Sequence, residues 1–306
     1  MLCATIRNRG RRALRVLITG AAGLVGHAVR ANCPAGNNVI GFDHQSLDIT
    51  DEVKVNNAFE RERPEVVVNC AAWTDVDGCE IDPERAQEAN ARGPELLARA
   101  CRKHDTLLIT ISTDYVFDGE KEGFYTQGDE PNPLSVYGLS KLEGERRAQE
   151  VCAATIVVRS GYIFGPGGRN FLSTVLARAQ RGQRIRAIHD MFGTPTYAPD
   201  LACQIFRLAK LGVPGTYHIV NSGEGASFAD FARAAVTGAG LSGSLVEAIS
   251  LKTLSRPAAR PRNSRLRCLF SEAIGLPALR ALPEALVEFV NAETSSKSSN
   301  PVIGTV

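Results

Sequence analysis

The 306-residue sequence has no apolar run of about 18 residues, the length that a membrane-spanning helix requires. Its first 14 residues carry four arginines and no acidic residue, but they also lack the apolar segment of a secretory signal. We interpret this segment as a solvated basic tail rather than a targeting signal. The sequence therefore predicts a cytoplasmic protein without a membrane partner.

Charge of one sign is also scarce, because 35 basic residues face 33 acidic ones and the formal net charge is only +2. This balance gives no reason to expect a dedicated nucleic-acid binder. The eight cysteines are scattered without a Cys-x-x-Cys pair, which argues against a zinc site or a disulfide framework. No set of carboxylates suited to a divalent cation stands out, so we predict no metal.

Short β-branched runs alternate with longer helical patterns over the first half of the chain. Such alternation is typical of strand-helix-strand units, and near-continuous apolar strands indicate a parallel sheet covered on both faces. The expected strands are Arg15 to Thr19, Asn38 to Phe42, Glu65 to Asn69, Thr106 to Ile111 and Thr155 to Arg159. The expected helices are Gly23 to Asn32, Val53 to Arg61, Asp82 to His104 and Val136 to Val151. We predict an α/β fold, a Rossmann-type doubly wound parallel sheet with a smaller C-terminal substrate-binding lobe.

The rhythm changes after Arg159, where Gly-Pro-Gly-Gly and Gly-Thr-Pro-Thr segments interrupt shorter elements. We expect an NAD(P)-binding Rossmann domain over residues 14–160. Residues 161–291 would form mostly the substrate-binding lobe, with some segments returning to the Rossmann sheet. Flexible tails are expected at residues 1–13 and 292–306, the second of which is Ser-rich with little apolar content.

The first expected strand leads directly into Gly20, Gly23 and Gly26 and then into a helical pattern. In this context Gly20 permits a sharp turn, Gly23 lets the backbone approach a pyrophosphate, and Gly26 lets the helix pack closely on the strand. The anion would lie at the helix N-terminus, against the backbone at Leu24 and Val25, where free N–H groups favour negative charge. A structural turn with incidental glycines is the less favoured alternative.

Asp43 ends the second expected strand about 20 residues beyond the loop, where an acid can accept hydrogen bonds from both ribose hydroxyls of NAD. His44 and Gln45 follow, and no arginine stands ready for a 2′-phosphate, so we predict NAD(P)H as the cofactor, with NADH preferred. Asp48 and Ile49 are candidates for the adenine end of the site. For Asp48 the alternative is an acid at the N-terminus of the next helix.

Tyr137 and Lys141 stand four residues apart, so on a helix a phenol and an ammonium share one face. Alone the pair is weak evidence, because Tyr and Lys are also common on solvated helix faces. Downstream of a dinucleotide-binding loop, it indicates a catalytic site at which both side chains meet one ligand.

Together these features resemble the extended short-chain dehydrogenase/reductases, and within them the chain is similar to the dTDP-4-dehydrorhamnose reductase family. The resemblance runs from about residue 14 to about residue 290. Beyond the glycine loop, it is carried by the segments 69–77, 112–119, 133–145, 190–196 and 260–266.

The resemblance implies that Tyr137 is the general acid of a ketone reduction and gives its proton to the oxygen of a keto sugar. Lys141 would stabilise the phenolate and also hold the nicotinamide ribose, which makes it a cofactor-binding residue as well. Thr113 matches the hydroxyl that binds the substrate carbonyl, with Ser112 as the alternative. Small residues after the third strand would let the cofactor pass close to the backbone, namely Cys70, Ala71 and Ala72.

Further residues are implied on the substrate side, namely Trp73, Thr74, Val76, Tyr115, Tyr162, Asn170 and Arg260. Trp73 is equally compatible with packing between sheet and loop. Tyr162 stands where the family leads us to expect a tryptophan, which leaves the identity of the sugar open. Arg260, with Arg262, could pair with a diphosphate through its planar guanidinium, although a single arginine is more often solvated.

The leading hypothesis is an enzyme, an NAD(P)H-dependent reductase whose substrate is a nucleotide sugar and which converts dTDP-4-dehydro-L-rhamnose to dTDP-L-rhamnose. An epimerase or dehydratase of the same fold is the first alternative, and Asp114 beside Thr113 keeps it open. A third hypothesis is a regulatory subunit that resembles the partner of methionine adenosyltransferase. A homodimer is compatible with each hypothesis.

Overall fold

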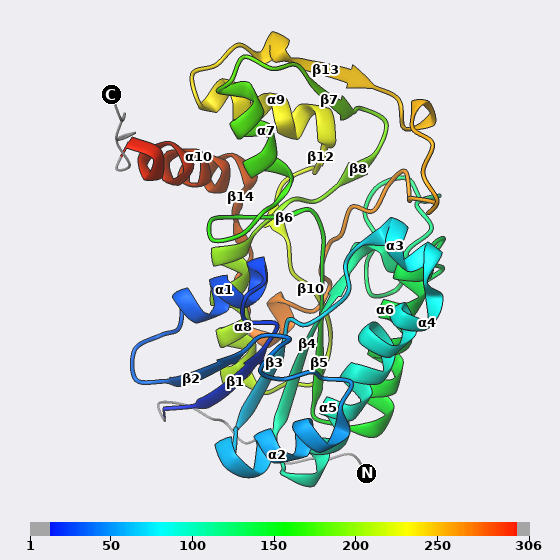
Figure 1. The fold of residues 1–306 in the computed structure, drawn as a ribbon, viewed down its shortest axis with the longest axis vertical. Coiled ribbons are helices and arrows are strands. Elements are labelled where there is room, and N and C mark those ends of the chain that lie inside the picture. The colour runs from blue at the N-terminus through cyan, green and yellow to red at the C-terminus, as the bar shows by residue number, and fades with distance from the viewer. Residues whose placement is uncertain (1–12, 299–306) are drawn as a thin grey trace, which may run out of the picture.

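Six strands form the central sheet of the computed structural model, which describes residues 13–298. From one edge to the other they are β10 (Gly215–His218), β5 (Thr155–Ser160), β4 (Leu107–Thr113), β3 (Val66–Asn69), β1 (Arg15–Thr19) and β2 (Asn38–Phe42). All neighbours pair in parallel, so the carboxyl ends of the strands meet at one edge. This confirms the predicted α/β fold (Figure 1). Residues 1–12 and 299–306 of the expected tails lie outside the described residues.

Side chains of the strands alternate between two apolar layers, as the period of a strand requires. Leu17 and Val67 face one layer, and Val16 and Val68 face the other. The first layer holds α2 (Glu52–Glu62), α5 (Gly93–Lys103) and α6 (Val136–Val151). The second holds α1 (Leu24–Ala31) and α8 (Ala198–Leu211). The sheet is therefore covered on both faces, as predicted from its continuous apolar strands.

Three elements differ from the expected ones. The single helix expected over residues 82–104 consists of α4 (Pro83–Gln87), a π-helical turn (Glu88–Arg92) and α5. The sequence pattern does not predict α3 (Val76–Ile81), because six residues are too few to show a helical period. It also misses β10, whose Gly-Thr-Tyr-His sequence is not an apolar run.

The C-terminal lobe lies above the sheet in Figure 1. In it, β7 (Ile185–Ile188) pairs with β13 (Val246–Ile249), and α7 (Phe171–Ala179) and α9 (Phe228–Gly238) pack on them. Shorter pairs are β6 (Ile163–Phe164) with β9 (Thr196–Tyr197), β8 (Phe192–Gly193) with β12 (Ala226–Ser227), and β11 (Asn221–Ser222) with β14 (Leu279–Ala281). Single 3-10 turns cover Gly243–Leu245, Leu251–Thr253 and Glu272–Ile274 in this half, and another, Asp114–Val116, follows β4 of the sheet. Two segments of this half, α8 and β10, return to the Rossmann layers.

The last described helix, α10 (Leu282–Ser298), packs on α9 through Phe289 and Val290. Residues 292–298, which we expected to begin a tail, are therefore helical. No Gly or Pro interrupts α10 after Pro283. The turns of α10 that pack on α9 can therefore be followed by a polar helical turn.

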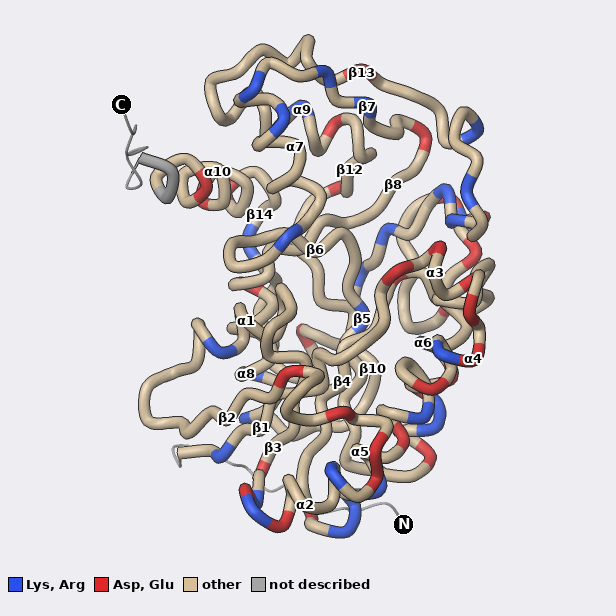
Figure 2. The backbone as a smooth tube through the Cα atoms, in the orientation of Figure 1, with Lys and Arg blue, Asp and Glu red and all other residues tan. Residues whose placement is uncertain are grey.

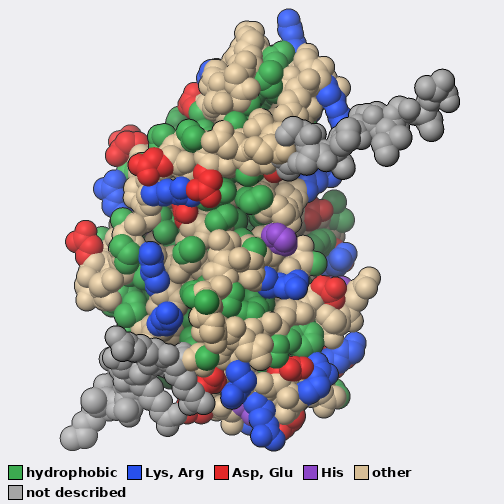
Figure 3. All heavy atoms as spheres, turned by 90° about the vertical axis from the view of Figure 1, so that its left-hand side faces the viewer, with side chains coloured by type: hydrophobic (Ala, Val, Ile, Leu, Met, Phe, Trp, Pro, Cys, Tyr) green, Lys and Arg blue, Asp and Glu red, His purple; other side chains and the backbone are tan. Residues whose placement is uncertain are grey.

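Basic and acidic residues are interspersed along the chain (Figure 2), and the face drawn in Figure 3 also carries both signs. Within residues 13–298, no helix combines the length and apolar character needed to cross a bilayer. The same residues contain no cluster of three or more His, Cys, Asp or Glu side chains suited to a metal ion.

Candidate active site

The glycine loop has the shape that a dinucleotide-binding turn needs. Gly20 has a φ of +65°, and a Cβ there would lie 2.6 Å from a backbone nitrogen of the turn after β3. A Cβ on Gly26 would lie 2.3 Å from the Gly20 carbonyl oxygen, so the turn and α1 leave no room for a side chain. Gly23 is the N-cap of α1 and has no side chain to cover the helix start. First-turn N–H groups, at Leu24 and Val25, therefore suit a pyrophosphate.

A cleft of about 440 Å³ extends from this loop across the carboxyl ends of β2 and β3. The expected cofactor residues that line it are Gly20, Gly23, Asp43, Asp48, Ile49, Cys70, Ala71 and Ala72. Leu24, Val25 and Gly26 form the start of α1 beside the cleft, and Lys141 lies deeper in the protein. Arg85 and Glu88 also line the cleft, and no sequence motif points to either. The position of the cleft, beside the glycine loop and at the carboxyl ends of the strands, is the one at which this type of sheet binds ligands.

Two acids after β2 are held ionised by neighbouring groups. Asp43 Oδ1 accepts hydrogen bonds from the Ser46 hydroxyl (2.6 Å) and backbone nitrogen (2.8 Å), and these bonds lower the pKa of Asp43. Burial raises the pKa of Asp48, but bonds from the Thr50 nitrogen (3.0 Å) and hydroxyl (2.8 Å) outweigh it and keep that pKa low. The acid that caps α2 is Asp51, so Asp48 does not fill that alternative role.

The three expected catalytic residues lie together at the end of β4. Tyr137 and Lys141 are buried on α6, whose start is capped by the Ser135 hydroxyl. Lys141 Nζ donates to the Ile111 carbonyl oxygen at 2.8 Å. The Thr113 hydroxyl lies near enough to the Tyr137 phenol to lower its pKa. A phenol, an ammonium and a hydroxyl therefore converge on one point.

Strand alternation separates the two candidate hydroxyls on β4. Thr113 faces Tyr137, whereas the Ser112 hydroxyl donates to the Glu145 carboxylate in the protein interior. Thr113 is therefore the hydroxyl beside the phenol, as expected, and Ser112 has a different partner.

Burial governs the protonation of the catalytic pair. It raises the pKa of Tyr137, although the Thr113 hydroxyl opposes this shift. It lowers the pKa of Lys141 to about 8, against the attraction of Glu145 and Cys70. Lys141 is thus mainly protonated near neutrality, and the phenol keeps its proton, as a general acid requires.

Asp114 lies beneath Thr113 and orients it. Its Oδ1 accepts from Thr113 Oγ1 at 3.1 Å, and its Oδ2 accepts from Ser264 Oγ at 2.5 Å. Burial raises the pKa of Asp114 to about 6, although both hydrogen bonds oppose it. Thr113 Oγ1 also accepts from the Tyr115 nitrogen at 3.1 Å. Both carboxylate oxygens are therefore engaged with the protein.

Trp73 both lines the cofactor cleft and packs with Val76 in a small apolar cluster. The Asn90 side chain holds its backbone, with Nδ2 donating to the Trp73 carbonyl at 3.0 Å and Oδ1 accepting from its nitrogen at 2.9 Å. The Arg85 guanidinium lies 4.4 Å from the centroid of the Trp73 ring. Thr74, in contrast, is exposed. Trp73 therefore both packs against neighbouring side chains and lines the cofactor cleft.

A second cleft, of about 290 Å³, lies between Tyr115 and the C-terminal lobe. Its aromatic and cationic lining includes Phe171, Phe228, Arg186, Arg256 and Arg260. Such walls suit a nucleobase and a diphosphate. Arg260, however, donates to both carboxylate oxygens of Asp77 on α3, at 2.9 and 2.8 Å. Both Nη groups of Arg260 thus bind a protein carboxylate, and its role as a diphosphate ligand stays a prediction.

Two other expected substrate residues are engaged with the protein itself. Asn170 caps α7, because its Oδ1 accepts from the Ser173 nitrogen at 3.1 Å and its Nδ2 donates to two loop carbonyls. Tyr162, at a φ of +47°, stacks on Phe228 with 4.1 Å between ring centroids. One face of the Tyr162 ring is therefore covered by Phe228. Its buried hydroxyl has no hydrogen-bond partner among the described residues.

Asn90 is the site residue that the sequence pattern misses. Its buried side chain, in the π-helical turn, links Trp73 to Ser140, whose Oγ accepts at 3.1 Å. Single π turns are frequent at functional sites. One sequence offers no signal for such a turn, because its hydrogen bonds depend on the tertiary neighbours.

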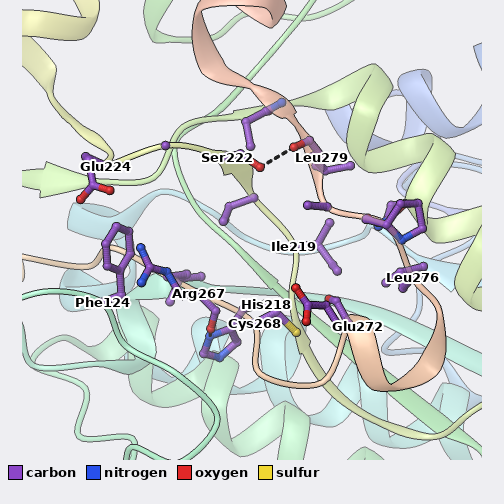
Figure 4. Close-up of a pocket in the computed structure, with 18 residues that line it drawn as sticks. Phe124, His218, Ile219, Ser222, Glu224, Arg267, Cys268, Glu272, Leu276 and Leu279 are labelled. Atoms are coloured by element: carbon purple, nitrogen blue, oxygen red, sulfur yellow. Dashed lines mark hydrogen bonds between the residues drawn. The ribbon is translucent and has the colours of Figure 1, made fainter.

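A third cavity, of about 350 Å³, lies between the segment after β10 and residues 266–279 (Figure 4). His218, which lines it, contacts the carbonyls of Tyr125 (3.3 Å) and Arg267 (3.1 Å) through Nδ1. Burial lowers the pKa of His218 to about 3, so the imidazole is neutral. The expected site residues all lie elsewhere, so this cavity is separate from the candidate active site.

The profile of the family described as RmlD substrate binding domain matches residues 14–295. The dTDP-4-dehydrorhamnose reductase of Streptomyces griseus is 36% identical over 297 residues, covering 95% of this chain and 97% of that relative. A Streptomyces antibioticus protein named probable dTDP-4,6-dihydroxy-2-methyloxan-3-one 4-ketoreductase is also 36% identical, covering 92% of this chain and 97% of that relative. The solved dTDP-4-dehydrorhamnose reductase from Bacillus anthracis in complex with NADP is similar at a TM-score of 0.88 and 31% identity, covering 92% of this chain and 99% of that one.

Proposed function

The chain belongs to the RmlD substrate binding domain family and is an NAD(P)-dependent oxidoreductase, and we propose that it reduces a nucleotide-linked 4-keto-6-deoxysugar. The leading substrate is dTDP-4-dehydro-L-rhamnose, which would yield dTDP-L-rhamnose for polysaccharide synthesis. The observation that carries the proposal is the position of Tyr137 between the two clefts. Trp73 from the first cleft and Tyr115 from the second both pack in its cluster. A ketone at the junction would meet the phenol.

Each catalytic residue has a separate task in this proposal. Tyr137 gives its proton to the ketone oxygen while the ketone carbon is reduced. Lys141, held by the Ile111 carbonyl, stabilises the phenolate that remains. Thr113 donates to the same oxygen, which requires its single proton to turn away from Asp114. NAD(P)H, when bound in the first cleft, supplies the hydride.

We further propose that NADH is preferred over NADPH. Asp43 is ionised, and its carboxylate would accept from ribose hydroxyls but repel a 2′-phosphate. The solved Bacillus anthracis relative is in complex with NADP, so both coenzymes must be compared. Asp43→Asn should narrow any preference for NADH, because it removes the repelling charge.

The sugar itself is the less constrained part of the proposal. Two relatives at equal identity carry the names of different ketosugar reductases. Tyr162, in place of the expected tryptophan, has one ring face stacked on Phe228. We therefore propose that the sugar is selected mainly by contacts other than stacking on Tyr162.

The alternative functions have weaker support. A dehydratase needs an acid that reaches the substrate, but both oxygens of Asp114 are engaged with Thr113 and Ser264. An epimerase would regenerate its coenzyme in each cycle and show no net NADH consumption. A regulatory subunit would show no turnover and would co-purify with a synthetase. The assembled triad favours an enzyme over the regulatory subunit, and net NADH consumption distinguishes the reductase from the epimerase.

We also propose that the protein acts in the cytoplasm as a homodimer, with no nucleic-acid or membrane partner. The absence of these partners is supported by the mixed charge on the face drawn in Figure 3, and by the lack of a membrane-spanning helix within residues 13–298. Light scattering on a sizing column would test the dimer, and a monomer at micromolar concentration would contradict it.

The experiment that tests the function is loss of NADH absorbance with purified protein and enzymatically generated dTDP-4-dehydro-L-rhamnose, run beside NADPH. Stoichiometric oxidation with appearance of dTDP-L-rhamnose is the expected result. Tight coenzyme binding without oxidation would move the assignment to an epimerase or a regulatory subunit.

A further inference from the structure

A buried ion pair joins α6 to the sheet directly beneath the catalytic residues. Glu145 Oε2 accepts from Arg159 Nη2 at 2.6 Å, and Arg159 Nε donates to both carboxylate oxygens at 3.0 and 3.1 Å. The side chains are only 3% and 8% exposed. Ser112 Oγ donates to the same carboxylate. One buried group thus connects α6, β4 and β5.

This carboxylate lies one helical turn beyond Lys141 on the same face of α6. Lys141 binds the carbonyl of Ile111, and Glu145 binds the hydroxyl of the next residue, Ser112. Consecutive residues of β4 therefore hold consecutive turns of α6. A buried ion pair is a weak means of stabilising a fold, because desolvation offsets much of the attraction. Its position beside the catalytic ammonium indicates a second task.

We propose that Glu145 is a positioning residue for Lys141, in which its buried negative charge holds the ammonium in place and keeps it protonated at neutral pH. Arg159 fixes the carboxylate in that position through three hydrogen bonds. The inference rests on the proposed function, in which Lys141 must carry its charge during turnover.

The other groups around Lys141 cannot supply this charge. Burial lowers the pKa of Lys141 to about 8, and Glu145 is the first group that opposes the shift, followed by Cys70. Burial raises the pKa of the Cys70 thiol to about 12, so the thiol is uncharged at neutral pH. The group that faces Lys141 from β4 is the neutral Ile111 carbonyl. Glu145 therefore provides the fixed negative charge.

Charged groups on the elements packed against α6 have other partners. Arg159 of β5 binds Glu145 itself, and Asp114 after β4 binds Thr113 and Ser264. Glu88 of the π-helical turn pairs with Arg92 at the surface. Among these groups, Glu145 is the one whose negative charge opposes the effect of burial on Lys141.

The test compares the pH dependence of kcat/KM for the wild-type protein and Glu145→Gln, which keeps the shape of the side chain and removes its charge. The alkaline limb, where Lys141 loses its proton, should move to lower pH by about one unit. Activity should return as the pH is lowered. A lower rate with the limb in its original place would overturn the proposal.

Glu145→Gln leaves the Arg159 guanidinium buried without its partner, which can weaken folding. The double variant E145Q/R159M removes both charges together, and it should show an acid shift of the limb that is smaller but in the same direction, with a recovered melting temperature. Ser112→Ala is the matched control, because it removes a hydrogen bond to the same carboxylate but no charge, and its limb should not move. An unmoved limb in the double variant would also overturn the proposal.

Failure of the proposed function would be distinguishable from failure of this inference. If the wild-type protein reduces no 4-keto sugar, the function is wrong, and the role of Glu145 is then measured from coenzyme binding. Lys141 is the residue expected to hold the nicotinamide ribose, so the pH dependence of NADH fluorescence should shift in E145Q and not in S112A. Equal pH dependence in both variants would contradict the positioning role.

Discussion

The Thr113 hydroxyl donates to Asp114 across 3.1 Å, and the far oxygen of that carboxylate accepts from Ser264 in the C-terminal half. One buried acid thus connects the catalytic strand with the segment that closes the second cleft. Burial raises its pKa to about 6, above the value of about 3.9 usual for an unfolded chain. The ionised form is therefore less stable in the folded protein. The contribution of Asp114 to the free energy of unfolding is therefore most favourable below about pH 4 and is lost as the pH rises through about 6.

Asp114→Asn tests this sign, because the amide has the same shape and does not titrate. As the pH rises from about 4 to about 7, the wild-type protein should lose about 2 to 3 kcal/mol of unfolding free energy relative to the variant. Urea unfolding of both proteins across this range measures the difference. The different hydrogen bonds of Asp and Asn change the free energy of unfolding by an amount that does not depend on pH. A difference between the two proteins that is the same at every pH would therefore contradict the raised pKa of Asp114.

Tyr137→Phe should lower kcat by roughly 100-fold or more, because the proton donor to the ketone oxygen is lost. Coenzyme affinity should stay nearly unchanged, since the phenol lies outside the lining of the first cleft. Single-turnover kinetics and NADH fluorescence measure the two quantities. Tyr217→Phe is the control, as its hydroxyl donates to the Val213 carbonyl at 3.1 Å and takes no part in the site. Unchanged turnover in Y137F would remove Tyr137 from the mechanism.

The sequence predicts best what local pattern determines. The bounds of β1, β2 and α6 match the expected ones, because apolar runs and a helical period end at residues that signal a boundary. The roles of Gly20 and Gly26 follow in the same way from their spacing. Tertiary contacts are not visible in such patterns. Arg260 binds Asp77 across a separation of 183 residues, and no spacing in the sequence predicts that partner.

The same limit explains the outcomes on the substrate side. The place of Tyr162 in a motif predicts a substrate-side residue, but its left-handed backbone and its stacking on Phe228 determine where its ring lies. Asn90 was missed because its importance comes from a π-helical turn that only the packed helices reveal. A motif thus identifies the residue type at a site, and the fold determines which partners that residue meets.

Gly26→Ala tests the close approach in the cofactor loop. Its Cβ would lie 2.3 Å from the Gly20 carbonyl, so the loop must shift, and we expect a loss of about 1 to 3 kcal/mol in stability with weaker coenzyme binding. Gly238→Ala is the matched control, because the nearest atom to its Cβ would be a Val290 methyl at 3.8 Å. That change should leave stability unchanged or raise it by up to about 1 kcal/mol. Equal effects of the two substitutions would argue against a tight turn.

Variants of Arg260 and Asp77 test whether their ion pair connects the two halves of the chain or whether Arg260 binds the diphosphate of the substrate. Both oxygens of Asp77 are bound, and the Arg260 side chain is 7% exposed, so we expect R260A and D77A to raise KM for the nucleotide sugar to a similar extent. If the residues act as one unit, the double variant should be no worse than either single variant, with a coupling of about 0.5 to 3 kcal/mol in stability.

Steady-state kinetics and urea unfolding of the four proteins provide both measurements. Arg262→Ala, two residues away and exposed, is the control for loss of a nearby positive charge. A direct diphosphate ligand would behave differently, because R260A would then raise KM far more than D77A, and the Asp77 variant would free the guanidinium to bind the substrate more tightly. Such an asymmetry would restore Arg260 to the substrate site, whereas equal effects would assign it to the closure of the C-terminal lobe on α3.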